Sequence, residues 1–189
     1  MADSIWKSTL EEFRDQLAGR DPVPAGVSVA AVTASLGLSL LMKVLEITRK
    51  RKDFDGDSAK IEEMLDSARA ESRELDRYAD EDIVAFAEYM ASRGAPNQVA
   101  ALRKAIETPL AAARAAASGL KLCAAAAAIT PSSIAPDLGT AAVLLAGSVR
   151  AMLLSVESNA LRLTDREFQD DIARDVENLR LLAKNHQQW

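Results

Sequence analysis

The chain has one cysteine and one histidine among its 189 residues. Cys123 lies in a run of alanines, where we expect a small buried apolar residue that forms no intrachain disulfide and is no nucleophile. His186 lies near the C-terminus, where chains fray, which argues against histidine acid–base catalysis and histidine-rich metal sites. Carboxylates, lysine and the backbone must therefore supply any chemistry, and we expect no metal and no tightly bound cofactor.

A surplus of basic residues is also missing, because 23 lysine and arginine residues stand against 28 aspartate and glutamate residues. Nucleic-acid binding needs a basic stripe that displaces phosphate counterions, so we expect no nucleic-acid partner. The N-terminus lacks the basic start and apolar run of a signal peptide. Together with the single cysteine, these absences predict a cytoplasmic protein.

Aromatic residues make up only 4% of the chain, and glycine and proline are sparse, whereas alanine and leucine abound. This balance favours helices over strands. A chain of this length suits one domain, and neither a repeat nor a low-complexity linker divides it. The sequence therefore predicts a single all-α domain over residues 1–189, folded as an up-and-down bundle of about six helices.

Apolar residues at helical spacing, with capping residues and prolines between them, place the helices. Ser8 and Thr164 are expected to begin capping boxes, and Ser28 to cap the second helix. Pro109 predicts a kink or a restart in the fourth helix, with Thr108 as its cap. The expected ranges are 8–18, 28–52, 58–93, 97–128, 136–163 and 164–182.

Two of the expected helices carry almost no charge. Residues 23–42 are uncharged and precede a basic run at 49–52, a pattern that resembles a membrane span. Prolines open this segment and small polar residues dilute it, which favours a central helix surrounded by protein. The fifth helix is similarly poor in charge. Two such helices have more apolar surface than the other helices of a six-helix monomer can cover. We therefore expect a homodimer and no membrane partner.

A series of short motifs resembles one enzyme family. In chain order they are the turn Pro24-Ala25-Gly26-Val27-Ser28, the pair Arg51-Lys52, Asp80 to Phe86, Thr108-Pro109-Leu110, Pro136 to Gly139, Ser155 to Asn159, and Thr164 to Phe168. In this order, from about Leu10 to Phe168, they resemble the formiminotetrahydrofolate cyclodeaminase and methenyltetrahydrofolate cyclohydrolase family. The resemblance implies an all-α homodimer that binds a tetrahydrofolate derivative, its substrate, in a cleft near the subunit interface.

The chain departs from the family pattern at several positions. The family's Pro-Gly-Gly-Gly-Ser turn has Ala25 and Val27 in place of two glycines, and its Gly-Asn pair is replaced by Thr130-Pro131. Pro136 stands where the family has a serine, and Ser155 where it has an asparagine. These departures keep open a repurposed enzyme that forms or opens carbon–nitrogen rings in a non-folate substrate.

The turn before the second helix is expected to contact the substrate. Glycine lets backbone N–H groups approach a ligand, and the helix N-terminus adds a partial positive charge. We therefore expect contacts from Pro24, Gly26 and Ser28. The side chains of Ala25 and Val27 leave less room for a ligand to approach the backbone, and a β-branched residue such as valine resists positive φ. The turn therefore takes another conformation, serves a differently shaped ligand, or merely opens the helix.

Two aspartates are the candidate acid–base groups. Opening a methenyl bridge adds water to an amidinium carbon and protonates the departing nitrogen, whereas cyclodeamination closes a ring and expels ammonia; a carboxylate serves both reactions. Asp82 interrupts an apolar stripe, and Asp137 opens a buried helix. The alternatives are a salt bridge from Asp82 to Lys52 or to another basic residue, and helix capping by Asp137. We expect the N-termini of both charge-poor helices to face one pocket that keeps an acidic side chain dry.

Three further residues are candidate substrate contacts. Arg51 and Lys52 suit the glutamate tail of folate, although a solvated charge run is the alternative. Asn159 suits a pterin edge or a neighbouring helix. The leading hypothesis is thus a cyclohydrolase or cyclodeaminase, and the others are the repurposed enzyme and a non-catalytic helical paralogue or partner subunit.

Overall fold

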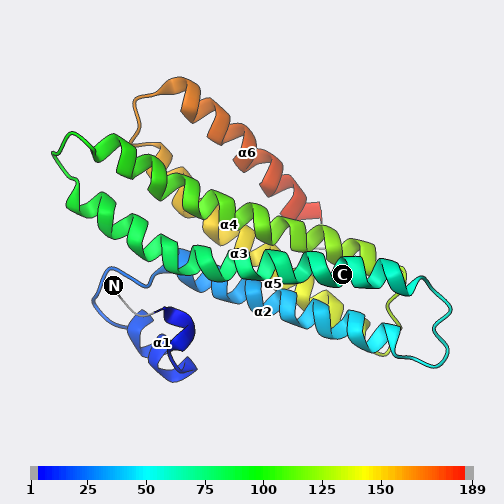
Figure 1. Ribbon diagram of the computed structural model, residues 1–189. Helices are drawn as coiled ribbons and strands as arrows, with labels where there is room; N and C mark the ends of the chain where they lie inside the picture. The colour runs from blue at the N-terminus through cyan, green and yellow to red at the C-terminus, as the bar shows by residue number, and fades with distance from the viewer. Residues whose placement is uncertain (1–3, 186–189) are drawn as a thin grey trace.

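The computed structural model describes residues 4–185 and contains only helices within that range (Figure 1). This confirms the prediction of an all-α fold. His186 lies outside the described residues. The helices are η1 (Ile5–Lys7), α1 (Leu10–Leu17), α2 (Gly26–Arg49), α3 (Ser58–Ala91), α4 (Gln98–Ala127), α5 (Ala135–Ala160) and α6 (Arg166–Asn185).

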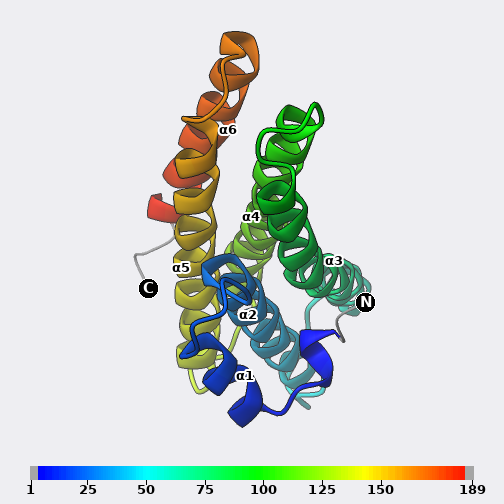
Figure 2. The same ribbon diagram turned by 90° about the vertical axis from the view of Figure 1, so that its left-hand side faces the viewer.

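Four long helices form the body of the molecule. Along the chain, α2, α3, α4 and α5 run alternately up and down, and α5 returns to pack against α2 (Figures 1 and 2). The outer helix α6 packs against α5 and α4, while α1 lies outside the bundle beside the start of α2. Because neighbouring helices are antiparallel, the starts of α2 and α4 share one end of the bundle with the ends of α3 and α5.

Three of the expected helix caps differ from those in the structure. Thr9 caps α1 in a capping box with Glu12, not Ser8. Asp165, not Thr164, caps α6, since its Oδ1 accepts a hydrogen bond of 3.1 Å from the backbone of Phe168. Ser28 does not cap α2, which starts two residues earlier, because the serine is buried and its hydroxyl donates to the Ala79 carbonyl at 3.4 Å. The hydroxyl of Ser28 thus bonds to a distant helix and does not cap its own helix.

Pro109 neither ends nor restarts a helix. Residues 98–127 form one helix through the proline, and Thr108 is buried inside it and caps nothing. A proline inside a helix costs about 3 kcal/mol because it removes a hydrogen bond and crowds the preceding turn. Packing of α4 against α3, α5 and α6 outweighs that cost, as tertiary contacts commonly do.

Small residues bring the central helices close together. A Cβ atom placed on Gly37 of α2 would lie 3.3 Å from the carbonyl oxygen of Ala141 in α5. One placed on Gly119 of α4 would lie 2.7 Å from Leu38 Cδ2. Cys123 is also buried here, as expected, and burial raises the pKa of its thiol to about 12, which makes it unreactive at neutral pH.

The outer sides of α2 and α5 remain exposed in a single chain. Large apolar side chains on these sides are exposed, among them Leu36, Val143 and Leu154. By length and composition α2, α4 and α5 could each cross a membrane, and 50–56% of each apolar window is buried inside the bundle. The bundle therefore covers only part of the apolar surface of its two charge-poor helices.

Candidate functional site

A pocket of about 310 Å³ opens at the end of the bundle where α2 starts and α5 ends. In Figure 1 this is the left-hand end. Side chains and backbone from the turn before α2, from α3, α4 and α5, and from the residues just after α5 form its wall. They are Pro22, Val23, Ala25, Gly26, Val27, Asp82, Phe86, Ala105, Leu154, Ser155, Ser158, Asn159 and Arg162. The pocket thus brings together three of the expected site residues: Gly26, Asp82 and Asn159.

Asp82 is the buried acid of this pocket. It projects from α3 with only 9% of its surface exposed, and no described residue pairs with its carboxylate or hydrogen-bonds to it. Loss of water around the carboxylate raises its pKa to about 6. The expected alternative, a salt bridge to Lys52, is wrong because Lys52 follows α2 at the opposite end of the bundle. A carboxyl group with this pKa can take up and release protons near neutral pH.

Asn159 is held firmly at the pocket wall. Its Nδ2 donates to the Ala105 carbonyl of α4 at 3.2 Å, and its Oδ1 accepts from Arg162 Nη1 at 3.2 Å. The contact with a neighbouring helix, one of the two expected alternatives, is therefore present. Because the amide also lines the pocket, this contact fixes the direction in which it can meet a ligand.

The turn before α2 forms one wall of the pocket without backbone strain. Ala25 takes an extended conformation, and Val27, like every other described non-glycine residue, has a negative φ. Val27 therefore does not need the positive φ that a β-branched residue resists, because α2 starts early enough to include Val27 in the helix. No side chain caps α2, so backbone N–H groups of its first turn are available to a ligand. Pro24 is not part of the wall, and Ser28 turns toward α3.

Asp137, Arg51 and Lys52 do not join this pocket within one chain. Asp137 lies at the start of α5, half-exposed, with Lys43 Nζ 3.8 Å from its Oδ2. Arg51 pairs with Asp53 at 2.6 Å just beyond α2. All three lie at the far end of the bundle, since α2 and α5 pack antiparallel. The expectation that the N-termini of both helices face one pocket is therefore wrong for a single chain.

Several residues of the wall were not expected from the sequence. Ser155, Ser158 and Arg162 lie at intervals of three and four residues, which places them with Asn159 on one side of α5 and its end. This spacing was the available signal. Phe86 ends one of the motifs that resemble the family, but an aromatic residue on an apolar stripe is more typical of a core position, so it was not expected in the pocket wall.

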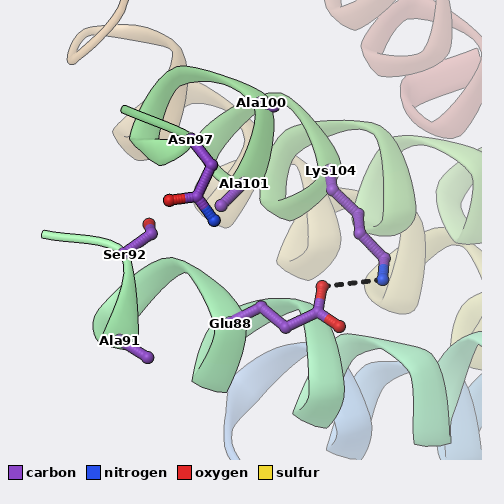
Figure 3. A pocket seen from close by; sticks show the side chains of 7 residues that line it. All are labelled: Glu88, Ala91, Ser92, Asn97, Ala100, Ala101 and Lys104. Atoms are coloured by element: carbon purple, nitrogen blue, oxygen red, sulfur yellow. Dashed lines mark hydrogen bonds and ion pairs between the residues drawn. The ribbon is translucent and has the colours of Figure 1, made fainter. Parts of the chain in front are cut away.

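A larger depression of about 530 Å³ lies between the end of α3 and the start of α4 (Figure 3). Figure 3 shows Glu88 and Lys104 facing one another. Lys104 Nζ lies 2.8 Å from Glu88 Oε2. Ser92 Oγ donates to the Tyr89 carbonyl at 2.8 Å. These polar groups satisfy one another, and both members of the ion pair are about half exposed. The pocket with Asp82 is the better candidate because it contains a buried acid without a partner.

Known proteins match this sequence and this fold. The sequence model of the family described as Formiminotransferase-cyclodeaminase matches residues 9–178. The chain belongs to this family. The family comprises enzymes of folate one-carbon metabolism, as the names of its relatives indicate.

Three family members illustrate the match. The methenyltetrahydrofolate cyclohydrolase of Methylorubrum extorquens is 27% identical over 183 residues, which cover 90% of this chain and 88% of the relative. The formimidoyltransferase-cyclodeaminase of Sus scrofa is 27% identical over 96% of this chain but only 36% of that enzyme. The crystal structure of formiminotetrahydrofolate cyclodeaminase from Thermotoga maritima superposes with a TM-score of 0.93, at 22% identity, and covers 97% of this chain and 94% of the other. That likeness establishes the fold.

Proposed function

We propose that this member of the family is a methenyltetrahydrofolate cyclohydrolase. The observation that carries the proposal is Asp82, a buried carboxyl group without a protein partner in the wall of the pocket, with a pKa raised to about 6 by burial. The cyclohydrolase from Methylorubrum extorquens supports this choice because the two chains match over nearly their whole lengths.

The chemistry follows from the charge of the substrate. The methenyl carbon bridges two nitrogens as an amidinium cation, which a carboxylate beside it stabilises. Water attacks this carbon, and Asp82 takes the proton that the water loses. Asp82 then returns a proton to the departing nitrogen as its bond to the carbon breaks. One nitrogen keeps a formyl group, the other gains N–H, and one proton is released to solvent.

Other groups of the pocket position the substrate. Asn159 offers an amide fixed by Ala105, and the first turn of α2 offers backbone N–H groups. Phe86 and Val23 add apolar surface that suits a flat ring. In this proposal Asp137 is a charge at a helix N-terminus, beside Lys43, and takes no part in the reaction.

Cyclodeamination of formiminotetrahydrofolate is the second candidate. The Sus scrofa relative, which bears the name of a cyclodeaminase, aligns with 96% of this chain. In this reaction a second nitrogen of the same substrate attacks the formimino carbon, and Asp82 would pass the proton that this nitrogen loses to the nitrogen that departs as ammonia. The two activities use the same acid and differ in their substrates.

A direct assay distinguishes the candidates. The purified protein is incubated separately with methenyltetrahydrofolate and formiminotetrahydrofolate, and loss of the methenyl bridge and release of ammonia are followed. We expect hydrolysis of the former, and an Asp82→Asn variant slower by roughly 100-fold or more because general acid–base catalysis contributes about that much. Asp170→Asn, an exposed aspartate on α6, is the matched control. A folded protein that turns over neither substrate would end the proposal.

We also propose that a second copy of the chain covers the outer sides of α2 and α5. Their exposed apolar side chains extend to Leu154, which belongs to the pocket wall as well. A bilayer is the less suitable cover, because α3 runs along the whole bundle with charged residues such as Arg69, Arg77 and Glu81 on its outer side. The cytoplasmic location stays a prediction.

A further inference from the structure

Arg162 is the residue of the pocket whose role remains to be assigned. It lies two residues beyond the end of α5 and is, with Asp82, one of two charged residues in the described wall. Its Nη1 donates to Asn159, and Asn159 is in turn anchored to the backbone of α4. These two hydrogen bonds tie the guanidinium to the rim of the pocket. An arginine has five N–H donors, so most of them remain available to a ligand.

The guanidinium has no carboxylate partner in residues 4–185, unlike the arginines that flank it in the fold. Arg103 of α4 pairs with Asp165, and Arg180 of α6 pairs with Glu157. These ion pairs neutralise the surroundings of the site. Arg162 therefore provides the one uncompensated positive charge among the described residues of the wall.

The two charges of the wall match the two ends of one kind of ligand. A methenyltetrahydrofolate is cationic at its bridge and carries carboxylates at its glutamate end. We propose that Arg162 binds the glutamate carboxylates while Asp82 faces the bridge, an assignment that rests on the proposed function. An arginine suits this task because its planar fork binds a carboxylate through two parallel hydrogen bonds.

This assignment replaces the basic residues expected from the sequence. Arg51 and Lys52 follow the C-terminal end of α2, at the opposite end of the bundle from Asp82. Arg51 is moreover already paired with Asp53. Arg162 is assigned to the glutamate tail of the substrate because it is the arginine that the fold places in the pocket.

The test compares two substrates that differ only in the charge of the tail. One is methenyltetrahydrofolate, and the other is its diamide, in which both glutamate carboxylates are blocked. Steady-state kinetics are measured for the unsubstituted protein and for Arg162→Gln, Arg162→Lys and the control Arg93→Gln. Arg93 is exposed just after the end of α3, outside the pocket, and has no carboxylate partner among the described residues. Circular dichroism melting checks that each variant is folded.

We expect Arg162→Gln to raise KM for the acid by about 10- to 100-fold, because a charge-assisted contact to the carboxylate is lost. Its kcat should stay within roughly threefold, and its KM for the diamide should stay unchanged. Arg162→Lys should recover part of the loss, since it keeps the charge without the fork. Arg93→Gln should behave as the unsubstituted protein does.

Two results would overturn the assignment while the proposed function stands. One is an active Arg162→Gln variant whose KM for acid and diamide rises by the same factor, which would indicate a structural role through Asn159. The other is a variant whose KM for the acid does not change. If the unsubstituted protein turns over neither folate substrate, the proposed function fails first, and the role of Arg162 falls with it.

Discussion

Asp82 lowers the stability of the folded protein, and its proposed role in the reaction explains why the residue is nevertheless present. Its carboxylate is nine-tenths buried, and no described residue donates a hydrogen bond to it. A buried charge without a partner opposes folding, and a neutral side chain of the same size would avoid this penalty. Active sites commonly keep such groups at the expense of stability because the reaction needs them.

The same residue makes the stability of the protein depend on pH. Burial raises the pKa of Asp82 from 3.8 to about 6, so its ionisation destabilises the folded state as the pH rises through this range. The penalty is absent below the lower value and complete above the higher one. Relative to the unsubstituted protein, Asp82→Asn should therefore gain about 2.5 kcal/mol in the free energy of unfolding between pH 4 and pH 8.

Urea unfolding at several pH values, followed by circular dichroism, measures this difference. The variant has its own unpaired amide, so the change of the difference with pH is the informative quantity and not its absolute size. Asp170→Asn serves again as the control, and its difference from the unsubstituted protein should not vary over this range. A difference for Asp82→Asn that is equally constant would contradict the raised pKa.

At the scale of helices, close packing depends on glycine at particular positions. Gly119 of α4 faces Leu38 of α2 and Leu145 of α5, and a Cβ atom there would lie 2.7 Å from one and 3.1 Å from the other. Both leucines are fully buried, so neither has free space into which it can turn. Gly147 of α5 is a natural comparison, since nothing lies within 4 Å of a Cβ placed on it.

We expect Gly119→Val to destabilise the protein by about 1 to 3 kcal/mol, because the added methyl groups overpack the contact of three helices. Gly147→Ala should instead stabilise it by roughly 0.5 to 1 kcal/mol, since alanine favours the helical backbone. Thermal melts of both variants give the comparison. Equal and small effects would show that α4 moves away from α2 and α5 without cost.

At the scale of the whole molecule, the exposed apolar sides of α2 and α5 determine how copies associate. Leu36 is 53% exposed and Val143 is 56% exposed. Under twofold symmetry such a surface can face its own copy. A lysine at either position would place a charge in an apolar interface, whereas a lysine elsewhere on the surface would be solvated.

We expect the unsubstituted protein to be a dimer and the double variant Leu36→Lys/Val143→Lys to be a monomer at the same concentration. Light scattering after size-exclusion chromatography measures the mass of each. Val99→Lys is the control, because Val99 is similarly exposed but lies on α4. An unsubstituted protein that elutes as a monomer, or that partitions into lipid vesicles, would contradict the proposed dimer.

Local features were predicted correctly where a short stretch of the chain determines the structure. Apolar spacing located the long helices α2 to α5 to within a few residues, because the periodicity of a helix is written in its own sequence. The apolar stripe around Asp82 likewise revealed a buried carboxylate. Prediction failed where a distant contact prevails, as at Ser28, whose hydroxyl turns to α3, and at Pro109, which packing keeps inside α4.

An all-helical chain, two charge-poor helices and an acid among apolar residues could all be predicted from the sequence, since each depends on neighbours a few positions away. Which side chains share a pocket depends instead on how the helices pack together. Antiparallel packing places Asp82 with Asn159 and Arg162, and it carries Asp137 and Arg51 to the far end. The position of a residue along its helix can be predicted from the sequence. The end of the bundle at which that residue lies depends on the direction of the helix, and this direction is set only when the helices pack together.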